Sequence, residues 1–130
     1  MSPAAPLPDD LRRFILTSVP SVPFLEALLL LRGRPDHAWS VAEVARALYV
    51  PEATAEAVAQ ALREVGLVEA DAGEAQRLHY HPRDAALAAM VDRLAEAYRV
   101  DLIGVTKLIH DRVQKNATRF ADAFRLRKEN

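Results

Sequence analysis

The pattern of apolar and polar residues divides the chain into several helical stretches around one short stretch with strand-like alternation. Apolar residues three and four apart, behind two aspartates that can cap a helix, predict a short helix over Asp10 to Thr17. A second helix is predicted from Pro23 to Arg32, with Gly33 behind it as a stop. This second helix has few polar positions, so we expect it to be well buried.

A capped helix and a longer helix follow, joined by a tight turn. Ser40 and Glu43 have the spacing of a capping box at the start of a helix. Pro51 is expected as the first residue of the next helix, because proline is favoured at that position. That helix is predicted from about Glu52 to Val65, and Gly66 is expected to end it.

Behind Gly66 the apolar residues change from a helical period to a period of two. Leu67 to Ala70 is predicted as a strand, and Asp71 to Glu74 as a turn. Gln76 to Tyr80 is predicted as the returning strand. The segment is therefore expected to form a short β-hairpin.

A long helix is predicted from about Arg83 to Val113, and it would be about 40 Å long if unbroken. Gly104 is its expected weak point. A long apolar stripe usually needs a partner to cover it, which predicts a homodimer through this helix and the N-terminal helices. The stripe follows an 11-residue repeat through Leu87, Val91, Leu94, Tyr98, Leu102, Val105 and Ile109.

This order of elements resembles the winged helix-turn-helix of bacterial transcription regulators of the MarR, PadR and ArsR type. Ser40 to Val65 matches the helix-turn-helix, and Leu67 to Tyr80 matches the wing. The resemblance implies a mainly α fold with a small β-hairpin wing, N-terminal helices and a long C-terminal helix. The expected division is 1–8 flexible N-terminus, 9–37 N-terminal helices, 38–81 winged helix-turn-helix, 82–115 dimerisation helix and 116–130 basic tail helix.

In such regulators the second helix of the motif enters the major groove and the wing contacts the DNA backbone. The resemblance therefore implies that Thr54 and Gln60 contact bases, while Arg46, Arg63 and Arg77 contact phosphates. The remaining groove-facing positions would be Pro51, Glu52, Ala53, Glu56 and Ala57.

The local charge favours a second interpretation. The chain has a formal net charge of -1, but residues 37–81 hold three arginines against seven acids, net -4. Residues 107–130 hold seven bases against three acids, net +4. Phosphate contacts need cations, so the acidic motif equally suits a protein-interaction adaptor that has lost DNA binding. Its partner-binding residues would be Glu52 and Glu56.

The tail beyond Asn116 is predicted as a short basic helix with Phe120 and Phe124 on one side. These aromatic residues would dock on the chain's own core or on a partner subunit, or anchor the tail in another protein's groove. The tail could also lie on DNA phosphates or on an anionic membrane.

No catalytic or cofactor motif is found in the sequence. Cysteine is absent, which excludes thiolate chemistry and fits a reducing compartment, and the four glycines stand apart, so no glycine-rich phosphate loop is formed. His79 and His81 share one face of a strand and could ligate a metal with His110 or Asp111, but this spacing usually marks a solvated face. We therefore predict no enzyme, no metal and no cofactor.

No segment is expected to span or cross a membrane. The longest aliphatic run, Ala27 to Leu31, is far shorter than the roughly 20 residues that a transmembrane helix needs. Met1 to Pro8 lacks the basic and apolar regions of a signal peptide, so a cytoplasmic location is predicted.

Overall fold

Helix α2 (Val22–Gly33) supplies the largest share of the apolar core. The computed structural model describes residues 7–71, 73 and 76–112. Ser21 caps α2 by accepting a hydrogen bond from the Phe24 N–H at 3.3 Å. Gly33 is the last residue of the helix rather than the residue after it. The side chains of Phe24, Leu25, Ala27, Leu28 and Leu31 are buried.

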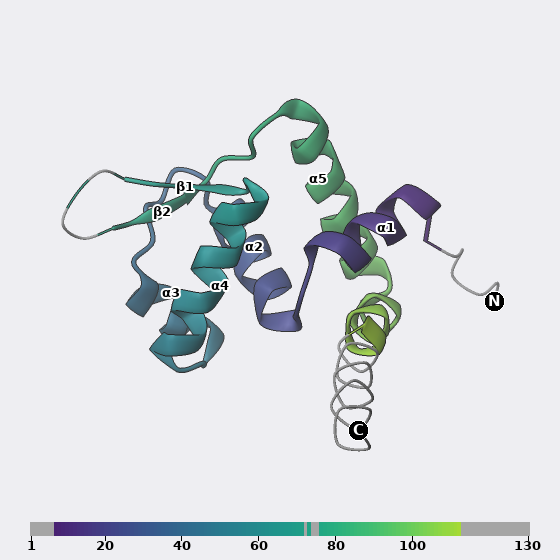
Figure 1. The fold of residues 1–130 in the computed structure, drawn as a ribbon, viewed down its shortest axis with the longest axis horizontal. Helices are drawn as coiled ribbons and strands as arrows, with labels where there is room; N and C mark the ends of the chain where they lie inside the picture. The colour runs from purple at the N-terminus through teal and green to yellow at the C-terminus, as the bar shows by residue number, and fades with distance from the viewer. Residues whose placement is uncertain (1–6, 72, 74–75, 113–130) are drawn as a thin grey trace, which may run out of the picture.

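Helices α1 (Asp9–Ser18) and α5 (Ala85–Val100) pack side by side at the opposite end of the molecule from the hairpin (Figure 1). Leu11 and Ile15 of α1 are buried. Arg93 of α5 donates two hydrogen bonds to Asp10, at 2.6 and 2.8 Å. The Arg93 guanidinium lowers the pKa of Asp10 to about 2. Helices α1 and α5 are thus joined by both close packing and an ion pair.

Helices α3 (Val41–Leu48) and α4 (Glu52–Val65) pack on each other and on α2. The capping box of Ser40 and Glu43 is confirmed, with both of its hydrogen bonds at 3.1 Å. Pro51 is the N-cap of α4 and not its first helical residue, since its backbone is extended with ψ 150°. Its carbonyl accepts the first hydrogen bond of the helix, from the Ala55 N–H. Gly66 ends α4 in the left-handed conformation, as predicted.

The hairpin consists of β1 (Val68–Ala70) and β2 (Leu78–Tyr80), each shorter than predicted. The strands are antiparallel, with Glu69 opposite His79. Trp39 adds a further bridge, because its N–H and carbonyl both bond Leu78 at 2.7 Å. The sequence did not predict this bridge, which joins the hairpin to the start of α3.

The long helix is divided in two, and the break lies at Asp101 rather than at Gly104. Helix α5 ends at Val100, and residues 102–112 form a separate helical stretch. The Asp101 carboxylate accepts a hydrogen bond from the Gly104 N–H at 3.1 Å, while the Asp101 carbonyl accepts from Val105. Asp101 thus ends one helix and caps the next, which the 11-residue apolar repeat could not reveal.

The predicted fold class, mainly α with a small β-hairpin, is confirmed. In the part of the chain that the structure describes, no single helix is long and apolar enough to cross a membrane. Helices α1 and α2 pass that test together, but they are bent by 108° relative to each other. The predicted tail beyond residue 115 lies outside the described residues.

Candidate nucleic-acid interface

Helix α4 has one face in the core and one face exposed to solvent. Its buried face consists of Ala55, Val58, Ala59 and Leu62. A helix buried on one side in this way is held rigidly by α2 and α3. The opposite face exposes five of the predicted groove-facing residues, namely Glu52, Ala53, Glu56, Ala57 and Gln60, whereas Thr54 is half-buried.

The amide of Gln60 is already engaged within the helix. It donates a hydrogen bond to the Glu64 carboxylate at 3.3 Å, one helical turn further along. Both side chains are exposed, so this bond competes with water and is weak. A base edge that offers an acceptor can therefore replace Glu64 at small cost.

Arg77, which was predicted to contact phosphate, is tied to the start of α3. Its Nη1 donates to the Glu43 carboxylate at 2.8 Å and to the Ala38 carbonyl at 3.3 Å. His37 Nε2 lies 3.0 Å from the other oxygen of Glu43. A guanidinium carries five N–H donors, so Arg77 keeps donors for an external anion while it connects the wing to the helix-turn-helix.

This cluster strongly favours the charged form of Glu43. The hydrogen bond from the Ser40 backbone N–H, followed by that with His37, lowers the pKa of Glu43 to about 2. The sequence indicated the Ser40 bond through the capping-box spacing, but it gave no signal for the contacts of Glu43 with Arg77 and His37. His37, in the loop before α3, is 6 positions from Glu43, and Arg77, in the wing, is 34 positions from it.

Arg46 and Arg63 are the two other predicted phosphate contacts. Both are exposed and lie in the last turns of α3 and α4, respectively. Within the described residues neither of them forms an ion pair, whereas Arg77 does. Their charge is therefore available to an anion from solvent.

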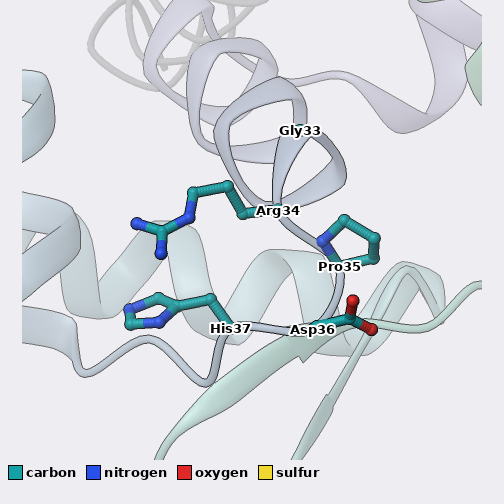
Figure 2. A pocket seen from close by; sticks show the side chains of 5 residues that line it. All are labelled: Gly33, Arg34, Pro35, Asp36 and His37. Atoms are coloured by element: carbon teal, nitrogen blue, oxygen red, sulfur yellow. The ribbon is translucent and has the colours of Figure 1, made fainter.

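The loop between α2 and α3 surrounds an open hollow of about 410 Å³. Figure 2 shows the side chains of Arg34 and His37 extending in the same direction, with the Asp36 carboxylate away from them. The guanidinium of Arg34 lies 5.8 Å from the centre of the Trp39 ring, and the His37 ring meets Trp39 edge-on at 4.6 Å. These contacts hold the loop against the Trp39 bridge and leave Arg34 exposed.

Comparison with known proteins adds one structural relationship. No family model and no curated protein matches the chain. A crystal structure of a MarR family transcription regulator matches with a TM-score of 0.50 and 21% identity, over 93% of this chain and 83% of that one. The chain has a winged helix fold. Its helix-turn-helix is α3 and α4, and its wing is the β1–β2 hairpin (Figure 1).

The residues expected to contact DNA and those expected to contact a protein partner lie on the same surface of the winged helix. Gln60, the proposed base contact, and Glu52 and Glu56, the proposed partner contacts, are all on the exposed face of α4. The other proposed partner contacts, Phe120 and Phe124, lie outside the described residues. Whether the protein is a DNA-binding module or a protein adaptor therefore depends on what the exposed face of α4 binds.

Proposed function

We propose that this winged helix is a DNA-binding module of the transcription-regulator type, with α4 as its reading helix. The observation that carries the proposal is the exposed face of α4, which is rigidly supported from behind and uncovered within the described part of the chain. The structural likeness to a MarR family transcription regulator supports the same reading. Such a module would act in the cytoplasm.

The acidic residues on α4 restrict how it can read DNA. Glu52 and Glu56 repel phosphates, but a carboxylate can accept a hydrogen bond from the cytosine N4 amino group in the major groove. Ala53 and Ala57 are small and permit close approach to the base edges, including contact with a thymine methyl group. Binding is therefore expected to be sequence-selective and to have a weak nonspecific component.

Replacement of Gln60 tests the base contact. Gln60→Ala is expected to weaken binding to a selected DNA site by about 1–3 kcal/mol, because a bidentate contact with adenine is lost. Glu64→Ala is the matched control, since it removes the acceptor that engages the Gln60 amide and should not weaken binding. Equal affinities of the Gln60→Ala variant and the wild type in a fluorescence-anisotropy titration would rule out this contact.

Charge reversal on α4 distinguishes a DNA module from a protein adaptor. The double change Glu52→Lys and Glu56→Lys should strengthen nonspecific DNA binding, because two repulsive charges become phosphate contacts. The double change Glu26→Lys and Glu96→Lys, on α2 and α5, is the control for the same change in total charge, since both residues are also exposed. If the α4 variant gains no more affinity than the control, α4 does not face DNA, and the adaptor interpretation takes its place.

We also propose that the protein is a homodimer. Val100, Leu102 and Ile103 lie around the break at Asp101 and are 63%, 53% and 78% exposed. They adjoin Val105 and Ile109, which are fully buried. Three large apolar side chains exposed so close together around the break are costly in water, and a second copy of the chain would cover them.

A further inference from the structure

The register of the hairpin places two histidines and a glutamate together on the wing. Glu69 of β1 lies directly opposite His79 of β2, and His81 follows two positions later. The backbone bonds from Asp71 to Arg77 at 2.8 Å and from His81 to Leu67 at 3.0 Å extend the antiparallel pairing on both sides. Alternate residues of a strand point to one face, so this register fixes the cluster.

The distances within the cluster are close to those of a metal site. Glu69 Oε2 lies 3.8 Å from His79 Nε2, and Glu69 Oε1 lies 3.5 Å from His81 Nε2. The three donor atoms all lie within 4.8 Å of one another. Ligands at 2.0–2.2 Å from a tetrahedral ion are separated by roughly 3.4 Å, so small side-chain rotations would bring the three into place.

Asp71 occupies the position of an outer-sphere partner. Its Oδ1 lies 3.5 Å from His79 Nδ1, on the opposite side of the ring from Glu69. A carboxylate that accepts the Nδ1 proton leaves the Nε2 lone pair directed at a metal, which is the usual arrangement of metal-bound histidine. Glu69 and Asp71 together thus orient both nitrogens of one imidazole.

Neighbouring cations do not neutralise this cluster. In the part of the chain that the structure describes, Glu69 and Asp71 pair with histidines and with no arginine or lysine. Arg77, on the same face of the hairpin, directs Nη1 to Glu43 and the Ala38 carbonyl. The local charge is therefore negative, which favours a divalent cation.

We propose that the wing binds a divalent transition-metal ion of the zinc type through His79, His81 and Glu69, with Asp71 as the orienting partner. Two imidazoles and one carboxylate form a donor set suited to zinc. His79 is about one-third exposed, and His81 and Glu69 are more than half exposed. A fourth position therefore stays open to water or to another ligand.

The sequence alone could not assemble this site. The ligands suggested from the sequence to complete a site with the two histidines were His110 or Asp111. These residues lie in the helical stretch 102–112 and are not part of the cluster. Glu69 becomes a partner only through the strand register, which places it opposite a residue ten positions later.

A consequence for DNA binding rests on the proposed function. A bound ion adds two positive charges to a wing whose exposed acids would otherwise repel phosphates. Metal binding at the hairpin is therefore expected to strengthen the affinity of the winged helix for DNA.

The site is tested by isothermal titration of Zn²⁺ into the untagged full chain, with the absorption spectrum of Co²⁺ as a second readout. One ion per chain is expected, with a tetrahedral cobalt spectrum. His79→Ala and His81→Ala should each weaken binding by at least about tenfold, and Asp71→Asn by about 10–100-fold. His110→Ala is the control, since His110 is exposed outside the cluster and its loss should leave the affinity unchanged.

Several results would overturn the metal site. These are the absence of binding by the folded protein, or equal affinities of the wild type and the His79→Ala and His81→Ala variants. A loss in the His110→Ala control as large as in those variants would do the same. Circular dichroism of each variant separates a lost site from a lost fold. The metal titration contains no DNA, so its failure leaves the proposed function intact, and a failure to bind DNA leaves the metal site intact.

Discussion

Single residues with a left-handed backbone decide where the two helices of the helix-turn-helix end. Tyr49 has φ 57 and closes α3, and Gly66 has φ 88 and closes α4. An L-residue pays a steric penalty in this region, whereas glycine does not. The tyrosine is 94% exposed, so the turn that aims α4 holds it there without any packing of its ring.

Gly66→Ala is expected to lower the free energy of unfolding by about 1–2 kcal/mol. Alanine at this position would have to adopt the left-handed backbone of Gly66, with φ 88°. Its Cβ would also lie only 3.2 Å from the Cβ of Arg83. Gly33→Ala is the matched control: it is helical, nothing lies within 4 Å of its new Cβ, and it should be neutral or slightly stabilising. Denaturant unfolding measures both variants, and equal effects would contradict the role given to Gly66.

Glu43→Gln is expected to change how stability depends on pH. The folded pKa of Glu43, about 2, lies below its ordinary value of 4.5. Its charge therefore contributes stability that is fully present above about pH 4.5 and is lost as the pH falls toward 2. Glutamine keeps an acceptor for Ser40 but not the charge.

The difference in unfolding free energy between the wild type and Glu43→Gln should therefore be largest near neutral pH and should close toward the acid end. Thermal unfolding across that range measures it. A difference that stays constant with pH would mean that the charge of Glu43 is not stabilised by its neighbours.

Local signals of this kind are what the sequence predicts well. The Ser40–Glu43 capping box and the Gly66 stop depend on residues within one helical turn, and both were confirmed. The assignment of Arg77 to phosphate missed its bond to Glu43, because that contact joins residues 34 positions apart. Only the folded hairpin brings the two together.

At the scale of whole elements, the largest difference from expectation is the division of the long helix. Apolar periodicity continues through Asp101, because both helical stretches contribute buried residues: Val91 and Leu94 before the break, and Val105 and Ile109 after it. Periodicity reports which side is buried and does not report whether the backbone bonds are continuous. The aspartate itself was the available signal, because an N-cap carboxylate accepts a hydrogen bond from the backbone N–H three residues later, here that of Gly104.

The variant Asp101→Ala tests the break in the helix, because a break and a continuous helix predict opposite changes in the free energy of unfolding. If Asp101 caps the stretch 102–112, its loss should cost about 1 kcal/mol and speed hydrogen exchange at the Gly104 amide. In an unbroken helix the same change would stabilise the protein by a few tenths of a kcal/mol, since alanine is the better helix former. A gain in stability would therefore contradict the break.

Alternation correctly predicted the two strands and their pairing as a hairpin, but it gave neither the register nor the additional bridge. Nothing in the period-two pattern indicated that Trp39 would pair with Leu78, because a single bridging residue has no periodicity. The same limit hid Glu69 as the neighbour of His79, since register depends on the turn between the strands.

On the scale of the whole molecule, the apolar residues around Asp101 predict the assembly state. Ile103→Asp is expected to convert a dimer into a monomer, because it places a charge in the proposed interface. Tyr49→Asp is the matched control, since Tyr49 is also a large, highly exposed side chain but lies on the helix-turn-helix, away from Asp101. Light scattering after gel filtration gives the mass, and a wild-type monomer at high concentration would contradict the dimer.

The distribution of charge over the chain separates the winged helix, which is proposed to read DNA, from a basic C-terminal segment. The winged helix is acidic, net -4 over residues 37–81, while residues 107–130 are basic, net +4. Phosphate affinity that arises from a few cations falls steeply with salt, whereas contacts to base edges depend less on it.

The most direct test of the proposed function is a titration of the full chain against a mixed-sequence duplex library at about 50 mM and about 200 mM salt, with sequencing of the bound fraction. We expect binding that weakens as salt rises and enriches one sequence, and enrichment that is lost in the Gln60→Ala variant. The absence of any binding at low salt by the folded protein would contradict the account, and the exposed face of α4 would then be assigned to a protein partner.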